Sequence, residues 1–430
     1  MEISSFCRLR DLKQLGVAHM VYPGAVHSRF EHSLGVYWLA GAAINMIKNL
    51  QVGMTALLTI IILTLYPVGD NYLSINMLSL QGAELGIDHF DIQTVKLAGL
   101  LHDVGRGPFS HVFEHDFLPR VPNGGQWKES HLIVQCNVID FQAHFGRKLI
   151  DGTFCWSHEE MSLKMIEHIV DVHSIDIESE SLNKVKEMVV ASNENAPSKS
   201  SKEKLFLYDI VANGRNGIDV DKFDYMVRDS RACRLGYEFQ FPRLLENMRV
   251  MDDEICYRAK ECLTVHKLFS TRADLHRTVY THAKVKAIEL MIVDALIKAN
   301  DELQIASSIH DPSTYWKKSC GVKIKEEDIA VTNVKIDMTQ GRNNPIDRVH
   351  FFKDYETDDK FTIEDESISH MLPSGHQDKI VRVYSKKPEL CARYMKQFAA
   401  VCEAFENFQV KTYGKIIQVH APPEKKKRQT

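Results

Sequence analysis

The chain has 430 residues, of which 44% are hydrophobic and 26% are charged, an ordinary globular composition that suffices for one large core or two domains. A formal net charge of -4 creates no basic field that demands a nucleic-acid partner. The nine cysteines are scattered without a CxxC pair, which favours reduced thiols in the cytosol or nucleus. The first residues contain too few apolar side chains for a signal peptide.

Helical periodicity dominates the first 300 residues. Residues 3–15 predict a short helix with basic side chains on its polar side. From 30 to 47, residues such as Leu34, Trp38 and Ile44 recur at helical spacing, and His32 lies in the first turns of this long helix. Further helices are expected over 91–101, 157–172 with Ser157 as its N-cap, 206–211, 217–229 and, as one helix or two, 263–300.

The uncharged segment 52–68 falls just short of the roughly 20 residues that span a bilayer comfortably. A spanning helix here would also place His32 and His102 on opposite sides of a membrane. We therefore expect a buried helix or a poorly packed insertion, and no membrane association.

The pattern changes after Pro312. Strands are expected over 322–337, 349–352 and 380–384, and a helix over 388–405. The sequence thus predicts a mainly α protein, with a helical domain over 1–305 and a small α+β region over 306–430. The basic run Pro423–Arg428 is either a solvated tail or a nuclear targeting signal.

An imidazole and a carboxylate stand side by side where the apolar run 95–101 ends, at His102 and Asp103. Such a pair can hold one divalent cation but cannot complete its coordination sphere. Other segments supply the missing groups, and mixed imidazole and carboxylate ligation suits Mn, Fe, Zn or Mg. We predict that one divalent ion is bound by His32, His102, Asp103 and Asp221.

A metal in such a site can lower the pKa of a bound water or neutralise phosphate charge. His111 and His158 are candidates for proton transfer near neutral pH. Basic side chains that we expect to cluster around these residues suit a polyanionic substrate, because guanidinium and ammonium groups bind phosphate by charge-assisted hydrogen bonds. These basic residues are Arg29, Arg106, Lys222, Arg228, Arg272 and Lys284.

The same residues carry a resemblance to a known family. The chain resembles the HD-domain phosphohydrolases, and within them the eukaryotic deoxynucleoside triphosphate (dNTP) triphosphohydrolases that contain SAM and HD domains. The matching stretches are Arg8–Gly16, Tyr22–Ala25, Arg29–Gly35, Ala98–Asp103, Gly107–His111, Arg215–Lys222, Thr271–Arg272, Leu275–Arg277, Tyr280 and Asn344–Asp347.

The resemblance implies a helical HD fold that hydrolyses a dNTP to the deoxynucleoside and inorganic triphosphate, in a nucleotide-activated oligomer of two to four subunits. It also implies a role for each matching residue. Catalytic positions fall on His111, His158, Glu114 and Arg106; triphosphate positions on Arg29, Lys222 and Arg272; deoxyribose positions on Gln14, Asp229 and Tyr280, with Leu15 and Tyr225 packing nearby; and positions for activating GTP or dNTP on Arg10, Arg243, Arg258, Lys260 and Lys353.

The sequence also departs from the family pattern at one site residue and in the length of three segments. Arg106 stands where the family has a histidine, and a permanently charged guanidinium can bind phosphate but cannot shuttle protons. No SAM domain is expected, and residues 52–80 and 128–155 have no counterpart in the pattern, so we interpret them as atypical insertions. The chain is also shorter than the family between 305 and 320.

Two other functions stay open at this stage. The first is hydrolysis of a different nucleotide, such as a monophosphate or a phosphodiester. The second is non-catalytic binding of nucleotides or of single-stranded nucleic acid, by a site weakened at Arg106. A coincidental set of histidines and aspartates is the weakest interpretation, because four separate segments agree.

Overall fold

The computed structural model describes residues 4–65, 85–121, 157–192, 204–237, 239–303, 306, 329–354, 359–363 and 375–385. Two compact units are formed, one by Met1–Ile324 with Val334–Ile380 and the other by Lys325–Asn333 with Val381–Thr430. All the candidate site residues belong to the first unit. The predicted domain boundary at 305/306 stays a prediction.

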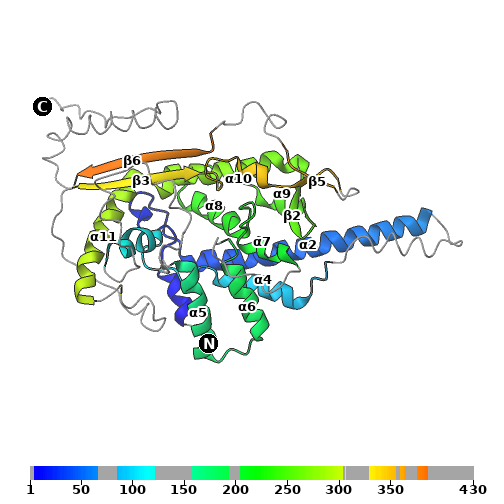
Figure 1. The fold of residues 1–430 in the computed structure, drawn as a ribbon, viewed down its shortest axis with the longest axis horizontal. Coiled ribbons are helices and arrows are strands. Elements are labelled where there is room, and N and C mark those ends of the chain that lie inside the picture. Colours follow the sequence, from blue (N-terminus) through cyan, green and yellow to red (C-terminus); the bar gives the residue numbers. More distant parts are fainter. Residues whose placement is uncertain are drawn as a thin grey trace, which may run out of the picture. The chain divides into compact units, whose positions relative to one another are not determined.

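Helices dominate the described residues, as predicted, and small sheets accompany them (Figure 1). The α-helices are α1 (Ser4–Cys7), α2 (Arg29–Leu65), α4 (His89–Leu101), α5 (His158–His173), α6 (Ser179–Val189), α7 (Tyr208–Val211), α8 (Val220–Ala232), α9 (Phe241–Glu246), α10 (Cys262–Leu275) and α11 (Ala283–Leu303). The 3-10 and π-helical turns are η1 (Arg8–Arg10), η2 (Ala18–Met20), η3 (Phe113–Phe117), η4 (Leu118–Arg120), η7 (Leu205–Leu207), η8 (Ala259–Glu261), η9 (His276–Tyr280) and η11 (Pro345–Arg348).

The strands form two sheets. One has the order β1-β2-β4-β5, from Met248–Met251, Glu254–Arg258, Phe351–Phe352 and Lys360–Phe361, and the other pairs β3 (Ile329–Asp337) with β6 (Gln377–Ser385). Strands β1 and β2 are antiparallel, whereas β2 and β4 are parallel. Of the strands expected over 322–337, 349–352 and 380–384, the structure shows β3 from Ile329, β4 at Phe351–Phe352 and β6 across the third range, while residues 322–328 lie outside the described residues. The β1–β2 hairpin was not expected.

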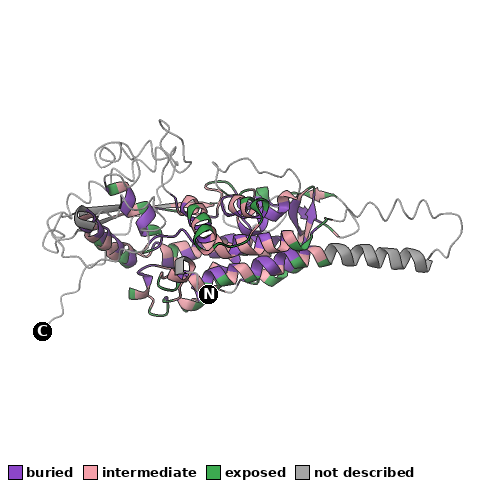
Figure 2. Ribbon diagram, turned by 90° about the horizontal axis from the view of Figure 1, so that it is seen from below, coloured by how far each residue is buried: buried purple, intermediate pink, exposed green. Residues whose placement is uncertain are grey.

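The long helix α2 packs against α4, α7 and α8, and these contacts organise the site (Figure 1). Buried residues follow one side of its first half (Figure 2). The predicted apolar stripe was partly wrong, because Leu34 is 45% exposed and Trp38 is 66% exposed. The buried side instead carries small residues such as Ala40, which lies 3.2 Å from the place where Gly99 would carry a Cβ. Small side chains at this crossing let α4 approach α2 closely.

Two other helix predictions need correction. The helix expected over 3–15 ends at Arg10, because the chain then turns and Lys13 pairs with Ser28 in an isolated β-bridge. The helix expected from 217 begins at Val220, because Gly217 has φ +78° and Asp219 is the N-cap. The segment 263–300 contains two helices, α10 and α11, separated by the π-turn η9.

The backbone of α2 continues through residue 65, so the first part of the 52–80 insertion is helical. The rest of that insertion, the 128–155 insertion, the helix expected over 388–405 and the basic run Pro423–Arg428 lie outside the described residues. Among the residues that are described, no helix has both the length and the apolar character required to cross a membrane.

Candidate active site

Three helices bring the four predicted metal ligands together. His32 lies in the first turn of α2, His102 and Asp103 follow the end of α4, and Asp221 lies in the first turn of α8. Nε2 of His32 is 3.1 Å from Oδ1 of Asp221, and Nε2 of His102 is 3.6 Å from the same oxygen. Oδ2 of Asp103 is 3.7 Å from Nε2 of each histidine. The structure therefore joins residues that the sequence separates by up to 189 positions, from 32 to 221.

The hydrogen bonds of the two imidazoles suit a metal site. Nδ1 of His102 donates to the carbonyl of Gly99 at 2.8 Å, so its Nε2 carries a lone pair. That Nε2 atom is buried and has no hydrogen-bond partner among the described residues. Nδ1 of His32 donates to Oδ2 of Asp224 at 2.7 Å and likewise directs Nε2 to the other ligands. The ligand atoms of His32, His102 and Asp221 all lie within 4.8 Å of one another, a set that fits a divalent cation, and Asp103 lies at the edge of this group.

The pKa values of His32 and Asp221 also show that this site favours a positive charge. Burial lowers the pKa of His32, but the hydrogen bonds that the protonated ring donates to Asp221 and Asp224 outweigh it and raise that pKa to about 9. Burial likewise opposes ionisation of Asp221, yet His102 and His32 hold its pKa well below the ordinary value. A proton on His32 thus stands in for the cation, which must displace it to bind.

Asp103 is held on both sides by guanidinium groups. Oδ2 accepts a short hydrogen bond from Arg29, and Oδ1 accepts from Nε of Arg106 at 2.8 Å. The Asp103 side chain is only 2% exposed, and burial alone would raise its pKa. Arg106 and Arg29 reverse that effect and keep the carboxylate ionised.

The helix α5 carries His158 and is fixed against the segment that follows Asp103. Ser157 caps α5, as predicted, by accepting from the backbone N–H of Glu160 at 3.2 Å. Gly105 donates its N–H to Oγ of Ser162 at 2.9 Å, and a Cβ at Gly105 would lie 2.2 Å from a backbone nitrogen of α5. Only glycine permits this approach, which sets the distance between α5 and the metal ligands.

A second group of titratable residues lies next to the metal ligands. Nδ1 of His158 is 2.8 Å from Oε2 of Glu114, which is buried. Burial raises the pKa of Glu114, but His158 and Arg106 lower it far below its ordinary value. Glu114 is therefore ionised and orients His158 so that Nε2 is the ring nitrogen left for chemistry.

Arg106 also determines the tautomer of His111. Nη1 of Arg106 lies 3.0 Å from Nδ1 of His111, and because a guanidinium only donates, Nδ1 must accept. The neutral ring consequently carries its proton on Nε2. The His111 side chain is partly exposed, but desolvation of the ring by surrounding protein atoms and, next, the positive charge of Arg106 hold its pKa well below the ordinary value, which favours the neutral ring near pH 7. The structure thus shows what the histidine-to-arginine departure does locally.

Of the three predicted triphosphate-binding cations, Arg29 contacts the candidate ligand Asp103 and Lys222 is next to Asp221 in the chain, whereas Arg272 lies on α10. Arg29 is buried and also donates to the backbone oxygen of Gln14 at 3.2 Å. Lys222 follows Asp221 directly and pairs with Asp219 at 2.7 Å, while Arg272 donates to the backbone oxygen of Asp337 at 2.7 Å. Each cation is therefore held by one or more protein oxygens.

The predicted deoxyribose residues form a connected group. The hydroxyl of Tyr280 donates to Oδ2 of Asp229 at 2.7 Å, and Tyr225 packs edge-on against Tyr280 with ring centroids 6.3 Å apart. Gln14 is buried, and its Oε1 has no hydrogen-bond partner among the described residues. Leu15, next in the chain, packs against the main core.

The predicted activator positions are only partly brought together within one chain. Arg243 pairs with Glu261 at 2.9 Å, and Lys260 lies 4.0 Å from the same carboxylate. Arg258 is opposite Phe352 in the β2–β4 register, next to Lys353. Arg10 instead lies over the ring of Phe30 at 4.6 Å.

Two contributors to the site were not assigned a role from the sequence. Asp224 orients His32 and is itself gripped by Arg228 through bonds of 2.8 and 2.7 Å. Its spacing of three residues from Asp221 and four from Arg228 places all three on one helix face, a signal present in the sequence. Ser110 links Arg29 to the backbone of Gln14, and its φ of +59° gave no sequence signal.

Comparisons with known proteins agree with this geometry. A family model described as HD domain matches residues 29–210. The chain is 30% identical to a deoxynucleoside triphosphate triphosphohydrolase SAMHD1 homolog of Dictyostelium discoideum, over 93% of the chain and 76% of that relative. It is 28% identical to human SAMHD1, over 99% of the chain and 74% of that protein.

The chain belongs to the SAMHD1 family of HD-domain proteins. A putative HD domain-containing protein of Acanthamoeba polyphaga mimivirus is also 30% identical, over 74% of this chain and 57% of its own length. The resemblance inferred from the sequence motifs is thereby confirmed. The candidate ligands His32, His102 and Asp103 fall inside the matched HD region.

Proposed function

We propose that this chain hydrolyses deoxynucleoside triphosphates, dGTP among them, to the deoxynucleoside and inorganic triphosphate and thereby limits dNTP pools. The observation that carries the proposal is the convergence of four metal-ligand side chains beside Arg29, Lys222 and the Glu114–His158 pair. Relatives of this chain are named deoxynucleoside triphosphate triphosphohydrolases, which supports the same reaction.

A divalent ion held by His32, His102, Asp103 and Asp221 would supply a Lewis acid that lowers the pKa of a water and withdraws charge from phosphate. Lys222, Arg29 and Arg272 neutralise the triphosphate by charge-assisted hydrogen bonds. The mixed ligand set suits Mn, Fe or Zn better than Mg.

Two histidines have distinct parts in the proposed reaction. Neutral His111 donates from Nε2, because Arg106 occupies Nδ1. His158, oriented by Glu114, holds or delivers a proton at Nε2 as the bond to the deoxyribose oxygen breaks. A positioned acid of this kind contributes about 10²- to 10⁴-fold to a rate.

The sugar residues support the preference for a deoxynucleotide. Oε1 of Gln14 is a buried acceptor without a partner, suited to a sugar hydroxyl. Asp229, Tyr280 and Tyr225 pack closely enough that an added 2′-hydroxyl would be crowded out.

Assembly, activation and location belong to the same proposal. The exposed cations Arg243 and Lys260 and the neighbouring Lys353 support binding of an activating GTP or dNTP between subunits of a homo-oligomer. The basic run Pro423–Arg428 supports a nuclear location.

The decisive experiment is product analysis. Purified protein is incubated with dGTP and Mn²⁺ or Mg²⁺, with and without GTP, and the products are separated. We expect deoxyguanosine and intact triphosphate, and loss of both in the His102→Ala/Asp103→Ala variant. The exposed His89→Ala variant, in which the substituted histidine lies outside the site, should retain full activity.

Other products would redirect the assignment. Release of pyrophosphate or single phosphate would contradict the triphosphohydrolase and favour hydrolysis of another bond. Salt-dependent oligonucleotide binding without any turnover would instead favour the non-catalytic function.

A further inference from the structure

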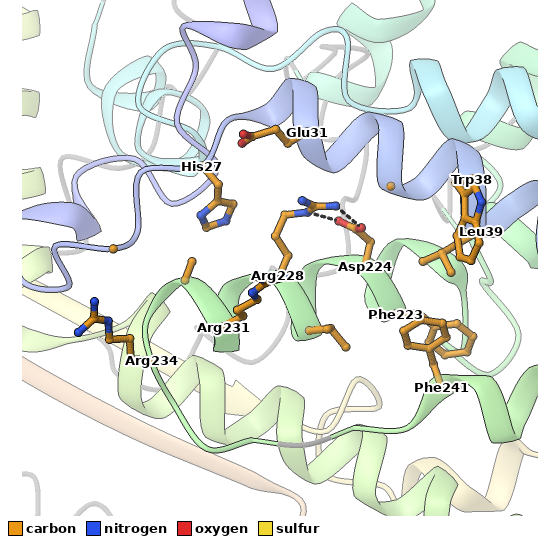
Figure 3. Close-up of a pocket in the computed structure, with 14 residues that line it drawn as sticks. His27, Glu31, Trp38, Leu39, Phe223, Asp224, Arg228, Arg231, Arg234 and Phe241 are labelled. Carbon is orange, nitrogen blue, oxygen red and sulfur yellow. Dashed lines mark hydrogen bonds and ion pairs between the residues drawn. The ribbon is translucent and has the colours of Figure 1, made fainter.

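A pocket of about 620 Å³ lies between α2 and α8, and none of the four candidate metal ligands lines it (Figure 3). Its volume is within the range of small-molecule sites in proteins. Helix α2 contributes Glu31, Gly35 and Trp38 to the lining, and α8 contributes Asp224, Arg228 and Arg231. None of the roles proposed above uses this space.

One end of the pocket is aromatic. Trp38 is 66% exposed, an unusual state for a side chain that is so large and apolar. Phe223 and Phe241 stack beside it, with ring centroids 5.8 Å apart and planes inclined by 12°. Figure 3 shows these rings gathered at one end of the pocket and the arginines toward the other. A flat apolar group would be covered on several sides there.

The charges at the other end are not balanced. Asp224 is already paired with Arg228, and Glu31 accepts from the backbone N–H of Ser28 at 2.6 Å. Arg231 and Arg234 are exposed, and their guanidinium groups have no ion pair or hydrogen bond among the described residues. Two free guanidinium groups are a natural complement to a phosphate group.

The pocket wall is bonded to the candidate active site through two side chains. Asp224 lines the pocket and accepts from the metal ligand His32 at 2.7 Å. His27 also lines it, and its Nε2 lies 2.7 Å from Oδ1 of Asp229, a predicted sugar-binding residue. The His27 side chain is only 10% exposed, and its Nδ1 has no hydrogen-bond partner among the described residues. A polar atom left in this state beside a pocket is a further indication of a ligand.

We propose that this pocket is a second ligand site, which takes a small aromatic phosphate, with its ring against Trp38 and its phosphate on Arg231 and Arg234. The ligand class follows from one aromatic end and one end with two free guanidinium groups. The pocket does not contain the candidate metal ligands. Two residues of its wall, Asp224 and His27, connect it to the candidate active site.

The test is direct binding of 1-naphthyl phosphate, measured by calorimetry on the full chain. We expect saturable binding to the wild type, and binding at least about tenfold weaker in both Arg231→Ala/Arg234→Ala and Trp38→Ala. Because these side chains are exposed, their removal should leave the thermal unfolding midpoint unchanged. Inorganic phosphate and 1-naphthol, each with half of the required chemistry, should bind at least about tenfold more weakly than the probe.

Two control variants separate this pocket from other sites. Arg120→Ala removes an exposed arginine elsewhere, and Lys222→Ala removes a cation of the candidate active site; both should bind the probe normally. No saturable binding to the wild type would overturn the proposal. So would binding that Lys222→Ala abolishes and Arg231→Ala/Arg234→Ala retains, because the probe would then occupy the active site. If inorganic phosphate bound as tightly as the probe, the proposed contact between the ligand's ring and Trp38 would be wrong.

Discussion

At the scale of single residues, Arg106 is the charged side chain that connects the candidate metal ligands with the candidate catalytic histidines. Its guanidinium contacts three site residues, through 2.8 Å to Asp103, 3.0 Å to His111 and 3.7 Å to Glu114. A histidine has two ring nitrogens and could not make all three contacts as a donor. Arg106 therefore cannot transfer a proton itself, but its hydrogen bonds orient Asp103 and fix the tautomer of His111.

We expect that in Arg106→Leu the His111 ring is no longer restricted to the Nε2–H tautomer, because Nδ1 loses the group that donates to it. In ¹⁵N–¹H spectra of the ring nitrogens, wild-type His111 should be the pure Nε2–H form, whereas the variant should show a mixture. Turnover of dGTP should fall by about 10²-fold or more, the usual contribution of a positioned acid. Arg106→His is the informative companion, since the family residue restores a titratable group.

An unchanged His111 spectrum in Arg106→Leu would contradict the role assigned to the 3.0 Å contact. Activity retained in Arg106→His but lost in Arg106→Leu would show that a donor, and not a permanent charge, is required at this position.

At the scale of elements, the crossing of α2 and α8 positions the candidate metal ligand His32 through its contact with Asp224. Gly35 lies where a Cβ would come within 1.9 Å of Oδ1 of Asp224 and 2.5 Å of Nη2 of Arg228. The absence of a side chain at Gly35 lets the Asp224 carboxylate reach His32 across the helix contact. This requirement is invisible in the helical periodicity of α2.

We expect Gly35→Ala to push Asp224 away from His32 and weaken divalent-cation binding by about 10- to 100-fold, the usual cost of losing such a partner. The matched control is Gly41→Ala, two turns further along α2, where the new methyl would meet only the flexible Lys96 side chain at 3.2 Å. Both substitutions raise helix propensity by about 1 kcal/mol, so the difference between them isolates the Asp224 contact.

The measurement is calorimetric titration with Mn²⁺ for both variants, with circular dichroism to verify folding. Equal Mn²⁺ affinity in Gly35→Ala and wild type would show that Asp224 does not position His32. Loss of affinity in Gly41→Ala as well would indicate a general effect on α2.

At the scale of the whole molecule, buried histidines give the fold a pH dependence that the net charge of -4 does not reveal. Burial lowers the pKa of His276 to about 3, with Arg272 adding to the shift. In the unfolded chain a histidine titrates near about 6.5. Between these two values the unfolded chain binds a proton that the folded chain does not, so the free energy of unfolding falls as the pH falls.

We expect His276→Gln to remove this part of the pH dependence. Between pH 6.5 and pH 5 the wild type should lose up to about 1.4 kcal/mol per pH unit relative to the variant. Urea unfolding of both proteins at pH 7, 6 and 5 measures the difference, in which all other groups cancel. A difference that stays constant over this range would contradict a neutral, half-buried His276.

Much of the molecule followed from local pattern. The helices around 30–47, 91–101 and 157–172 and the Ser157 cap were predictable, because periodicity and capping depend on residues a few positions apart. The family, and with it the candidate ligands, followed from short motifs whose chemistry is tied to their residue types. Asp224 could have been found from its spacing to Asp221 and Arg228 on α8.

Only the tertiary structure decided which side of α2 is buried, how Arg106 acts on His111, and why Gly35 must lack a side chain. It also revealed a pocket that is lined by Trp38 toward one end and by Arg231 and Arg234 toward the other. These features depend on distances between segments far apart in the chain, whereas a sequence pattern reports only the neighbours of each residue. The sequence by itself determined the chemical groups and most helices; packing determined which atoms face one another.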